Sequence, residues 1–115
     1  MTKTIITTDQ PVVTLINSFT VAPERQDELI RLLVEATEQV MRHQPGFVSA
    51  NIHRGLDGTR VANYAQWRRR EDFEAMLRDP AAQVHMREAA AIALFDPVLY
   101  EVADTFQVGS GGTGP

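Results

Sequence analysis

The chain has 115 residues, of which 43% are hydrophobic and 23% are charged. That length fits one compact domain with a single hydrophobic core. Eleven lysines and arginines stand against fifteen aspartates and glutamates, giving a net charge of -4, so we do not expect nucleic acid as a partner. Cysteine is absent, which excludes disulfides, thiolate metal sites and cysteine nucleophiles.

The apolar residues are spread along the chain rather than gathered in long runs. The first ten residues lack the apolar core of a signal peptide, and no run of 18 apolar residues occurs. We therefore expect a soluble, cytoplasmic protein with no membrane association.

The first predicted elements are a strand and a helix. Alternation over 12–21 predicts a strand whose apolar face includes one polar residue, Asn17. Pro23 and a run of acidic residues then favour a helix start, and apolar residues recur at helical spacing until the helix closes near His43.

Two strand-like runs, 47–54 and 60–67, follow, separated by five residues that include two glycines. This pattern predicts a β-hairpin. If Arg54 pairs with Arg60, one face of the hairpin carries Asn51, His53, Asn63 and Trp67.

The last elements are predicted to be two helices and a strand. A short helix over 70–78 precedes Asp79 and Pro80, an N-cap residue followed by a proline at the first helical position. The second helix is expected to run from Pro80 to about Ile92, and alternation predicts a final strand over 97–106.

This order of elements predicts an α+β fold of the ferredoxin-like, split βαβ type: a four-stranded antiparallel sheet with helices on one face. The domain is expected to span 12–107, after an N-terminal extension over 1–11 and before a flexible, glycine-rich tail over 108–115.

The second face of the sheet needs a partner because helices cover only the first. We predict a homodimer in which two sheets pack face to face. The residues expected on that second face are Val12, Ile16, Val48, Ala50, Ile52, Ala62, Tyr64 and Leu99.

Two short motifs do not predict a binding site. Residues 109–114 match G-x-G-x-x-G, but no helix can follow them in this chain, so a nucleotide site is not expected there. His85 and Glu88 share a helical face, but they supply too few ligands, and no metal site is predicted.

The polar residues on the helix-covered face have two interpretations. Each can be satisfied singly, with Asn51 and Asn63 bonded across the hairpin, His53 at the strand end and Trp67 packed in the core. Taken together with Asn17, they favour a pocket, because apolar walls with a few convergent polar groups are typical of a small-molecule site.

Three segments carry a resemblance to a known family: Gly46 to Ala50, Asp57-Gly58-Thr59, and Asn63-Tyr64-Ala65-Gln66-Trp67, followed by Phe73. Over about 12–106 the chain resembles the antibiotic biosynthesis monooxygenases, small ferredoxin-like chains that form dimeric α+β barrels. The segment from Asn63 to Trp67 most resembles the branch that oxidises aromatic compounds to quinones without a cofactor.

The resemblance implies roles for particular residues. Asn63 and Trp67 would donate hydrogen bonds to substrate oxygens, and Arg87 on a later helix would complete the catalytic set. Phe73 stands where that branch uses a tyrosine. The residues expected to bind substrate are Asn17, Asn51, His53, Phe73, Met76 and His85.

Such an enzyme takes its electrons from the substrate, so the resemblance implies an electron-rich phenol, hydroquinone or anthrone that reacts with O2. Either His53 or His85 can be the base. A haem-degrading monooxygenase is the alternative, with Asn17 and His85 in two of its positions and Met76 where that branch has a tryptophan. A non-catalytic dimeric module or a cyclase on the same barrel is a further alternative.

Overall fold

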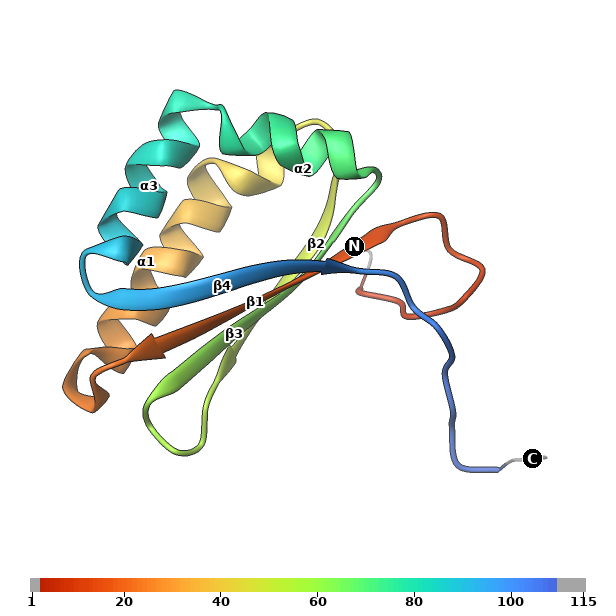
Figure 1. Ribbon diagram of the computed structural model, residues 1–115, viewed down its shortest axis with the longest axis horizontal. Helices are drawn as coiled ribbons and strands as arrows, with labels where there is room; N and C mark the ends of the chain where they lie inside the picture. Colours follow the sequence, from red (N-terminus) through yellow and green to blue (C-terminus); the bar gives the residue numbers. More distant parts are fainter. Residues whose placement is uncertain (1–2, 110–115) are drawn as a thin grey trace.

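The computed structural model describes residues 3–109 as a four-stranded antiparallel sheet covered on one face by helices (Figure 1). The strand order is β2-β3-β1-β4. This arrangement confirms the predicted ferredoxin-like α+β fold. The elements are β1 (Val13–Val21), α1 (Gln26–Gln39), β2 (Phe47–Arg54), β3 (Arg60–Trp67), α2 (Arg70–Leu77), α3 (Pro80–Ala90) and β4 (Ala93–Tyr100), with 3-10 turns at Pro23–Arg25 and Met41–His43.

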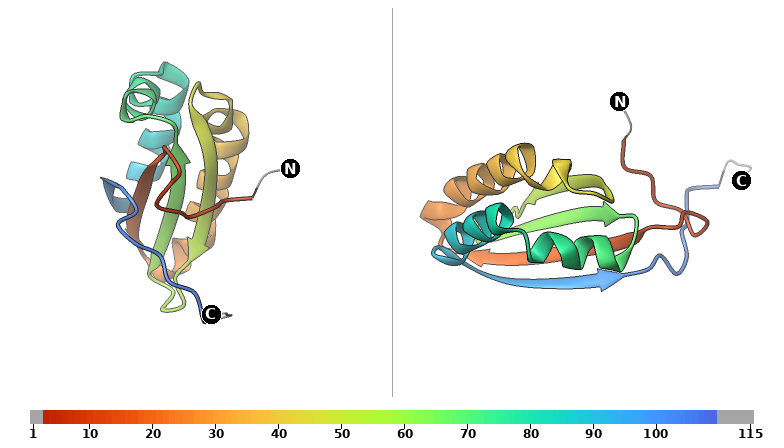
Figure 2. Two further views of the ribbon diagram at one scale, coloured as in Figure 1. Left: turned by 90° about the vertical axis from the view of Figure 1, so that its right-hand side faces the viewer. Right: turned by 90° about the horizontal axis from the view of Figure 1, so that it is seen from above.

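The helices form one layer. The views in Figure 2 place α1 beside α3 over the sheet, with α2 at the end where β3 finishes. Within residues 3–109, no helix is long and apolar enough to cross a membrane. Of the predicted tail, 108–115, residues 110–115 lie outside the described residues, as does most of the G-x-G-x-x-G match.

The last strand corrects one prediction. It spans Ala93–Tyr100 instead of 97–106, and α3 stops at Ala90. Alternation placed Pro97 at the start of the strand. It lies inside the strand instead, and its missing N–H is tolerated because β4 is at the sheet edge.

The hairpin register corrects a second prediction. The Gly55 N–H donates to the Arg60 carbonyl at 2.8 Å, so the loop closes one residue later on the β2 side than expected. As a result, His53 lies opposite Ala62 and Asn51 opposite Tyr64. Since a shift of one residue turns every side chain to the other face, Asn51 and His53 do not share a face with Asn63.

A bulge between Phe47 and Ser49 restores the predicted pairing of Phe47 with Trp67 at the far end of the hairpin. The same register moves Ala50 and Ile52 to the helix-covered face, and Leu99 packs against the core there as well. The prediction that these three lie on the second face was therefore wrong. Ile16, Ala62 and Tyr64 do lie there.

The core is divided into two clusters along the sheet. One is built around Leu15, Trp67 and Phe73, and the other around Phe19 and Leu29. Alternation along β1 places Asn17 between Leu15 and Phe19, and its cross-strand partner on β3 is Asn63. The polar pair therefore lies at the boundary between the two clusters.

Gly46, which precedes β2, has a positive φ of 83°. A Cβ atom at this position would lie 2.2 Å from an Asp72 carboxylate oxygen. Gly58 in the hairpin loop has nearly the same φ, 82°, but nothing lies within 4 Å of its Cβ position. A side chain at Gly46 would therefore meet both backbone strain and a steric clash, whereas a side chain at Gly58 would meet backbone strain alone.

We expect Gly46→Ala to lower the free energy of unfolding by about 2–4 kcal/mol, because the left-handed conformation and the clash both oppose the new methyl group. Gly58→Ala carries the conformational cost alone and should lower it by about 1 kcal/mol. Urea denaturation of the two variants measures the difference, and equal losses would show that Asp72 moves aside without cost.

Candidate active site

A cavity of about 120 Å³ lies between the sheet and the helices at the boundary of the two core clusters. Its floor is formed by strand residues, among them Asn17, Asn63 and Ala65, and its walls come from all three helices. Most of its surface is apolar. Small residues at Ala50 and Ala65 leave this space between the larger side chains.

Two side-chain amides lie next to each other on the cavity floor. Asn17 and Asn63 are cross-strand partners, so their side chains project side by side toward the helices. The Oδ1 atom of each is buried and has no hydrogen-bond partner among the described residues. An unpaired buried polar atom costs on the order of 1–3 kcal/mol, so this pair opposes stability unless a ligand completes it.

Trp67 supplies a third polar group without a partner. Its side chain is only 2% exposed, and its indole Nε1 is buried with no acceptor among residues 3–109. Phe47 and Phe73 hold the ring by edge-on contacts, with ring centroids 5.6 and 6.1 Å away. The indole is therefore fixed by packing, with its N–H available to an acceptor in the cavity.

Methionines line much of the remaining wall. The chain has four, and all three that follow Met1 border the cavity: Met41, Met76 and Met86. Methionine is unbranched and polarisable, so such walls adapt to flat aromatic ligands more readily than branched side chains do. The cavity can therefore change its shape around a ring.

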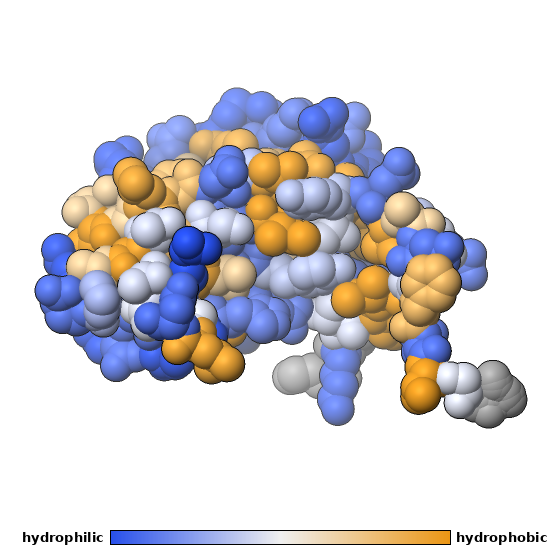
Figure 3. Space-filling view, turned by 60° about the horizontal axis from the view of Figure 1, so that its bottom comes forward, coloured by the Kyte–Doolittle hydropathy of each residue, from blue (hydrophilic) through white to orange (hydrophobic). Residues whose placement is uncertain are grey.

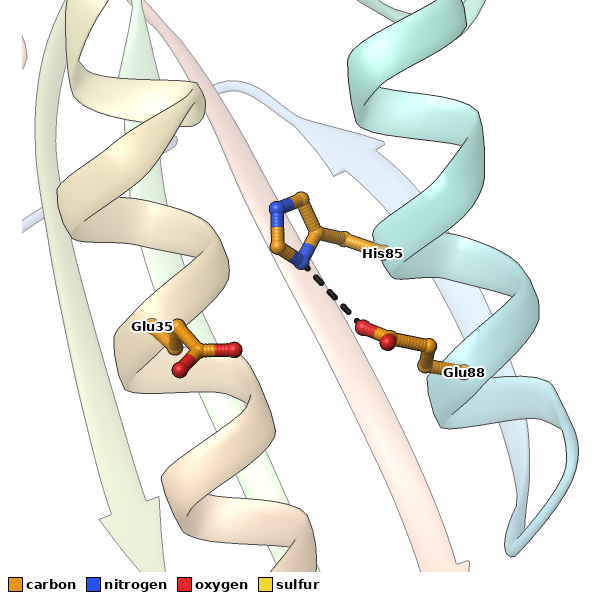
Figure 4. A group of neighbouring side chains, drawn as sticks. All are labelled: Glu35, His85 and Glu88. Carbon is orange, nitrogen blue, oxygen red and sulfur yellow. Dashed lines mark ion pairs between the residues drawn. The ribbon is translucent and has the colours of Figure 1, made fainter.

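A histidine from α3 also borders the cavity. His85 Nδ1 is buried and lies 3.4 Å from Glu88 Oε1, one helical turn along α3 (Figure 4). Glu35 on α1 reaches the same point, so one ring nitrogen and two carboxylate oxygens lie within 4.8 Å of one another. Glu35 and Glu88 are exposed, whereas the His85 side chain is 13% exposed.

The start of α3, which fixes where His85 lies, is defined by its cap. The Asp79 carboxylate accepts hydrogen bonds from the Ala81 and Ala82 N–H groups, and Gln44 donates to it at 2.9 Å. The Gln44 hydrogen bond, followed by the bond from the Ala81 N–H, lowers the pKa of Asp79 below its ordinary value. Asp79 therefore ties α3 to the loop that leads into β2.

The structure brings six of the predicted site residues to the cavity and leaves three elsewhere. Those at the cavity are Asn17, Asn63, Trp67, Phe73, Met76 and His85. Asn51 points to the opposite face of the sheet, where it donates to Thr4 Oγ1 and to the Tyr64 carbonyl. His53 is exposed on that face, and Arg87 is exposed on α3 away from the cavity lining.

Sequence reasoning missed several lining residues. Phe95 and Pro97 were not predicted to line the cavity, because the last strand was predicted to span 97–106 and in fact spans Ala93–Tyr100. Met41 follows α1, and Met86 lies beside His85 on α3. The scarcity of methionine could have indicated Met41 and Met86, because the three methionines that follow Met1 all line the cavity.

The fold and this cavity define a class: small α+β proteins that hold an apolar pocket with a few convergent hydrogen-bonding groups between a sheet and its helices. Comparison with known proteins narrows that class. The family model described as "Antibiotic biosynthesis monooxygenase" matches residues 12–88, which is more than half of the chain. The chain belongs to the antibiotic biosynthesis monooxygenase family.

Relatives within and around the family support the same assignment. The tetracenomycin-F1 monooxygenase of Streptomyces glaucescens is 47% identical over 102 residues, covering 89% of this chain and 88% of that protein. SnoaB, described as a cofactor-independent oxygenase from Streptomyces nogalater, is 28% identical with a TM-score of 0.73, covering 83% of this chain and 96% of that one. The expectation that this protein is a monooxygenase is confirmed.

A third relative supports the fold alone. The monooxygenase from ActVA-Orf6 of Streptomyces coelicolor, solved in complex with nanaomycin D, has a TM-score of 0.77 and 24% identity. It covers 86% of this chain and 94% of that one.

Proposed function

We propose that this protein is a cofactor-independent monooxygenase that uses O2 to oxidise an electron-rich aromatic polyketide, such as a phenol, hydroquinone or anthrone, to a quinone. One observation carries the proposal: Asn17, Asn63 and Trp67 place polar groups without partners around one apolar cavity. The two unpaired amide oxygens can accept from hydroxyl groups and the indole N–H can donate to an oxygen, so these groups match a flat, apolar ligand edged with hydroxyl and carbonyl groups. The identity to the tetracenomycin-F1 enzyme and to SnoaB supports the same chemistry.

In this mechanism the protein's task is to form and hold the substrate anion. Amide and indole N–H groups from Asn63 and Trp67 donate hydrogen bonds to the oxygen on which negative charge develops, in a site with a mostly apolar lining. For an anthrone or a phenol, the anion gives one electron to O2, the two radicals combine into a peroxide at the ring carbon, and loss of water leaves the quinone. Arg87 has no part in this proposal because it lies outside the cavity lining.

The cavity favours an aromatic substrate over haem. It offers about 120 Å³ of mostly apolar space, and its methionine walls can move to admit the edge of a fused aromatic system. Haem is wider than such a system in both directions, so it would require a larger rearrangement of the same walls. Asn17 and His85 do border one cavity, as the haem-degrading branch implies, but Met76 stands where that branch has a tryptophan.

We also propose that the protein acts in the cytoplasm as a homodimer with its sheets face to face. The strand register aligns Tyr64, Ile16 and Val98 across the face that the helices leave open. Figure 3 shows hydrophobic side chains among hydrophilic ones on the side of the molecule turned to the viewer. Tyr100 and Leu94 beside it are 47% and 78% exposed. Sedimentation velocity at micromolar concentration tests this assembly, and a single monomeric species would contradict it.

The oxygenase proposal is tested by oxygen uptake. Purified protein treated with a chelator is mixed with a panel of anthrones and hydroquinones, and the product is analysed by mass spectrometry after reaction under ¹⁸O2. For the anthrones, in which a CH2 group becomes C=O, we expect one O2 consumed per molecule of quinone, with one labelled oxygen in the product. Uptake no faster than spontaneous oxidation across the panel would refute the proposal.

A further inference from the structure

Three ionisable side chains connect the cavity with the solvent between α1 and α3 (Figure 4). His85 borders the cavity, whereas Glu88 on the same helix and Glu35 on α1 are exposed. The donor and acceptor atoms of the group lie within 4.8 Å of one another. A proton that leaves the cavity at His85 therefore has two carboxylates next to it on the solvent side.

The geometry gives the two ring nitrogens of His85 different roles. Nδ1 is buried, lies 3.4 Å from Glu88 Oε1 and makes no hydrogen bond among the described residues, and Figure 4 shows the other nitrogen, Nε2, directed away from that carboxylate. A carboxylate beside Nδ1 favours the tautomer with its proton on Nδ1. The lone pair is then on Nε2, which makes that nitrogen the acceptor. Catalytic contacts of this kind are often long before substrate binds.

Two carboxylates lie beside His85, and the cavity lining holds no lysine or arginine. From α1 it faces Glu35, and from its own helix Glu88. The sheet and α2 contribute only uncharged cavity residues, such as Asn17, Phe95 and Met76. An imidazolium that forms here is therefore stabilised by two carboxylates and opposed by no cation in the cavity lining.

We infer that His85 is the base of the reaction, with Glu88 and Glu35 as the positioning residues that orient its ring and stabilise its charged form. This inference rests on the proposed function. His85 Nε2 takes a proton from the substrate, and the electron pair of that bond stays on the substrate as the anion that reacts with O2.

The His85 imidazole also takes part in the later steps and ends in its neutral form. For an anthrone, the imidazolium first protonates the peroxide. His85 then removes the second hydrogen of the same carbon as a proton while the O–O bond breaks and the C=O bond forms. The expelled hydroxide takes that proton and leaves as water, which restores neutral His85 and balances the overall conversion of CH2 and O2 to C=O and H2O.

The test separates kcat from KM for anthrone oxidation. In Glu88→Gln kcat should fall by about 3- to 10-fold while KM stays nearly unchanged, because the imidazolium formed in the step loses a neighbouring negative charge. Glu35→Gln should act in the same direction, and the double variant should lose more. Glu38→Gln is the matched control, since this exposed α1 residue lies outside the group and its replacement changes the net charge equally.

A second readout does not depend on activity. ¹⁵N NMR of the neutral ring should show the proton on Nδ1 in the wild type and a mixture of tautomers in Glu88→Gln. Oxidation of anthrone with an unchanged kcat in the double variant, an unchanged tautomer or a chelator-sensitive rate would overturn the role of the group while leaving the proposed function intact. Failure of the whole substrate panel would instead remove the proposed function.

Discussion

Replacing Asn63 by leucine is expected to raise the stability of the protein and to lower its rate of oxidation. Leucine has nearly the same shape, and it removes a buried amide oxygen that has no partner among the described residues. Because an unpaired buried acceptor is costly, the free energy of unfolding should rise by about 1 kcal/mol. The same change removes a donor to the developing oxyanion, so kcat should fall by about 100-fold or more.

Urea denaturation and oxygen uptake with anthrone measure these two effects on the same preparation. Asn51→Leu is the matched control, because Asn51 is on the opposite face of the sheet, where its amide donates to Thr4 Oγ1 and to the Tyr64 carbonyl. This control should lose stability and keep its rate of oxidation. If Asn63→Leu loses stability as well, the Asn63 amide is part of the packed core rather than a group that awaits a ligand.

The contrast between these two asparagines shows what could and could not be predicted from the sequence. Element order, the polar position of Asn17 on an apolar face and the family resemblance were sufficient for the fold and for the residues on β1 and β3. The face of β2 depended on which residue pairs with Arg60 across the hairpin loop. The Gly55 N–H makes that bond, and a difference of one residue moved Asn51 and His53 away from the site.

The remaining errors have a similar physical origin. The cavity wall formed by Phe95 and Pro97 was missed because alternation over 97–106 placed the last strand about four residues too late, whereas β4 begins at Ala93 and tolerates Pro97 as an edge strand. The pairing of His85 with Glu35 was missed because it joins two helices. Only the spacing of His85 and Glu88, one turn apart on one helix, could be read along the chain.

The candidate site combines a cost in stability with an expected gain in catalysis. Unpaired polar atoms on Asn17, Asn63 and Trp67 lie together between the two apolar clusters of the core. Stability lost at that boundary is the cost of hydrogen-bonding groups that are already in position when a substrate enters, so that they need no reorganisation during the reaction.

Trp67→Phe should separate the packing role of the indole from its role as a donor. Phenylalanine keeps an aromatic ring near Phe47 and Phe73 but loses volume, which alone would cost about 1–3 kcal/mol. Loss of the unpaired Nε1–H offsets part of that cost, so we expect a net loss of about 1 kcal/mol. Without the donor, kcat for anthrone oxidation should fall by about 10- to 100-fold.

Leu29→Val is the control for packing alone. Leu29 is fully buried in the second core cluster and does not border the cavity, so this variant should lose about 1 kcal/mol of stability and oxidise anthrone at the wild-type rate. If both variants lost activity in proportion to their stability, packing would be the only role of Trp67. A large loss confined to Trp67→Phe assigns the indole N–H to the reaction, because the two variants then differ in the donor and not in the stability of the fold.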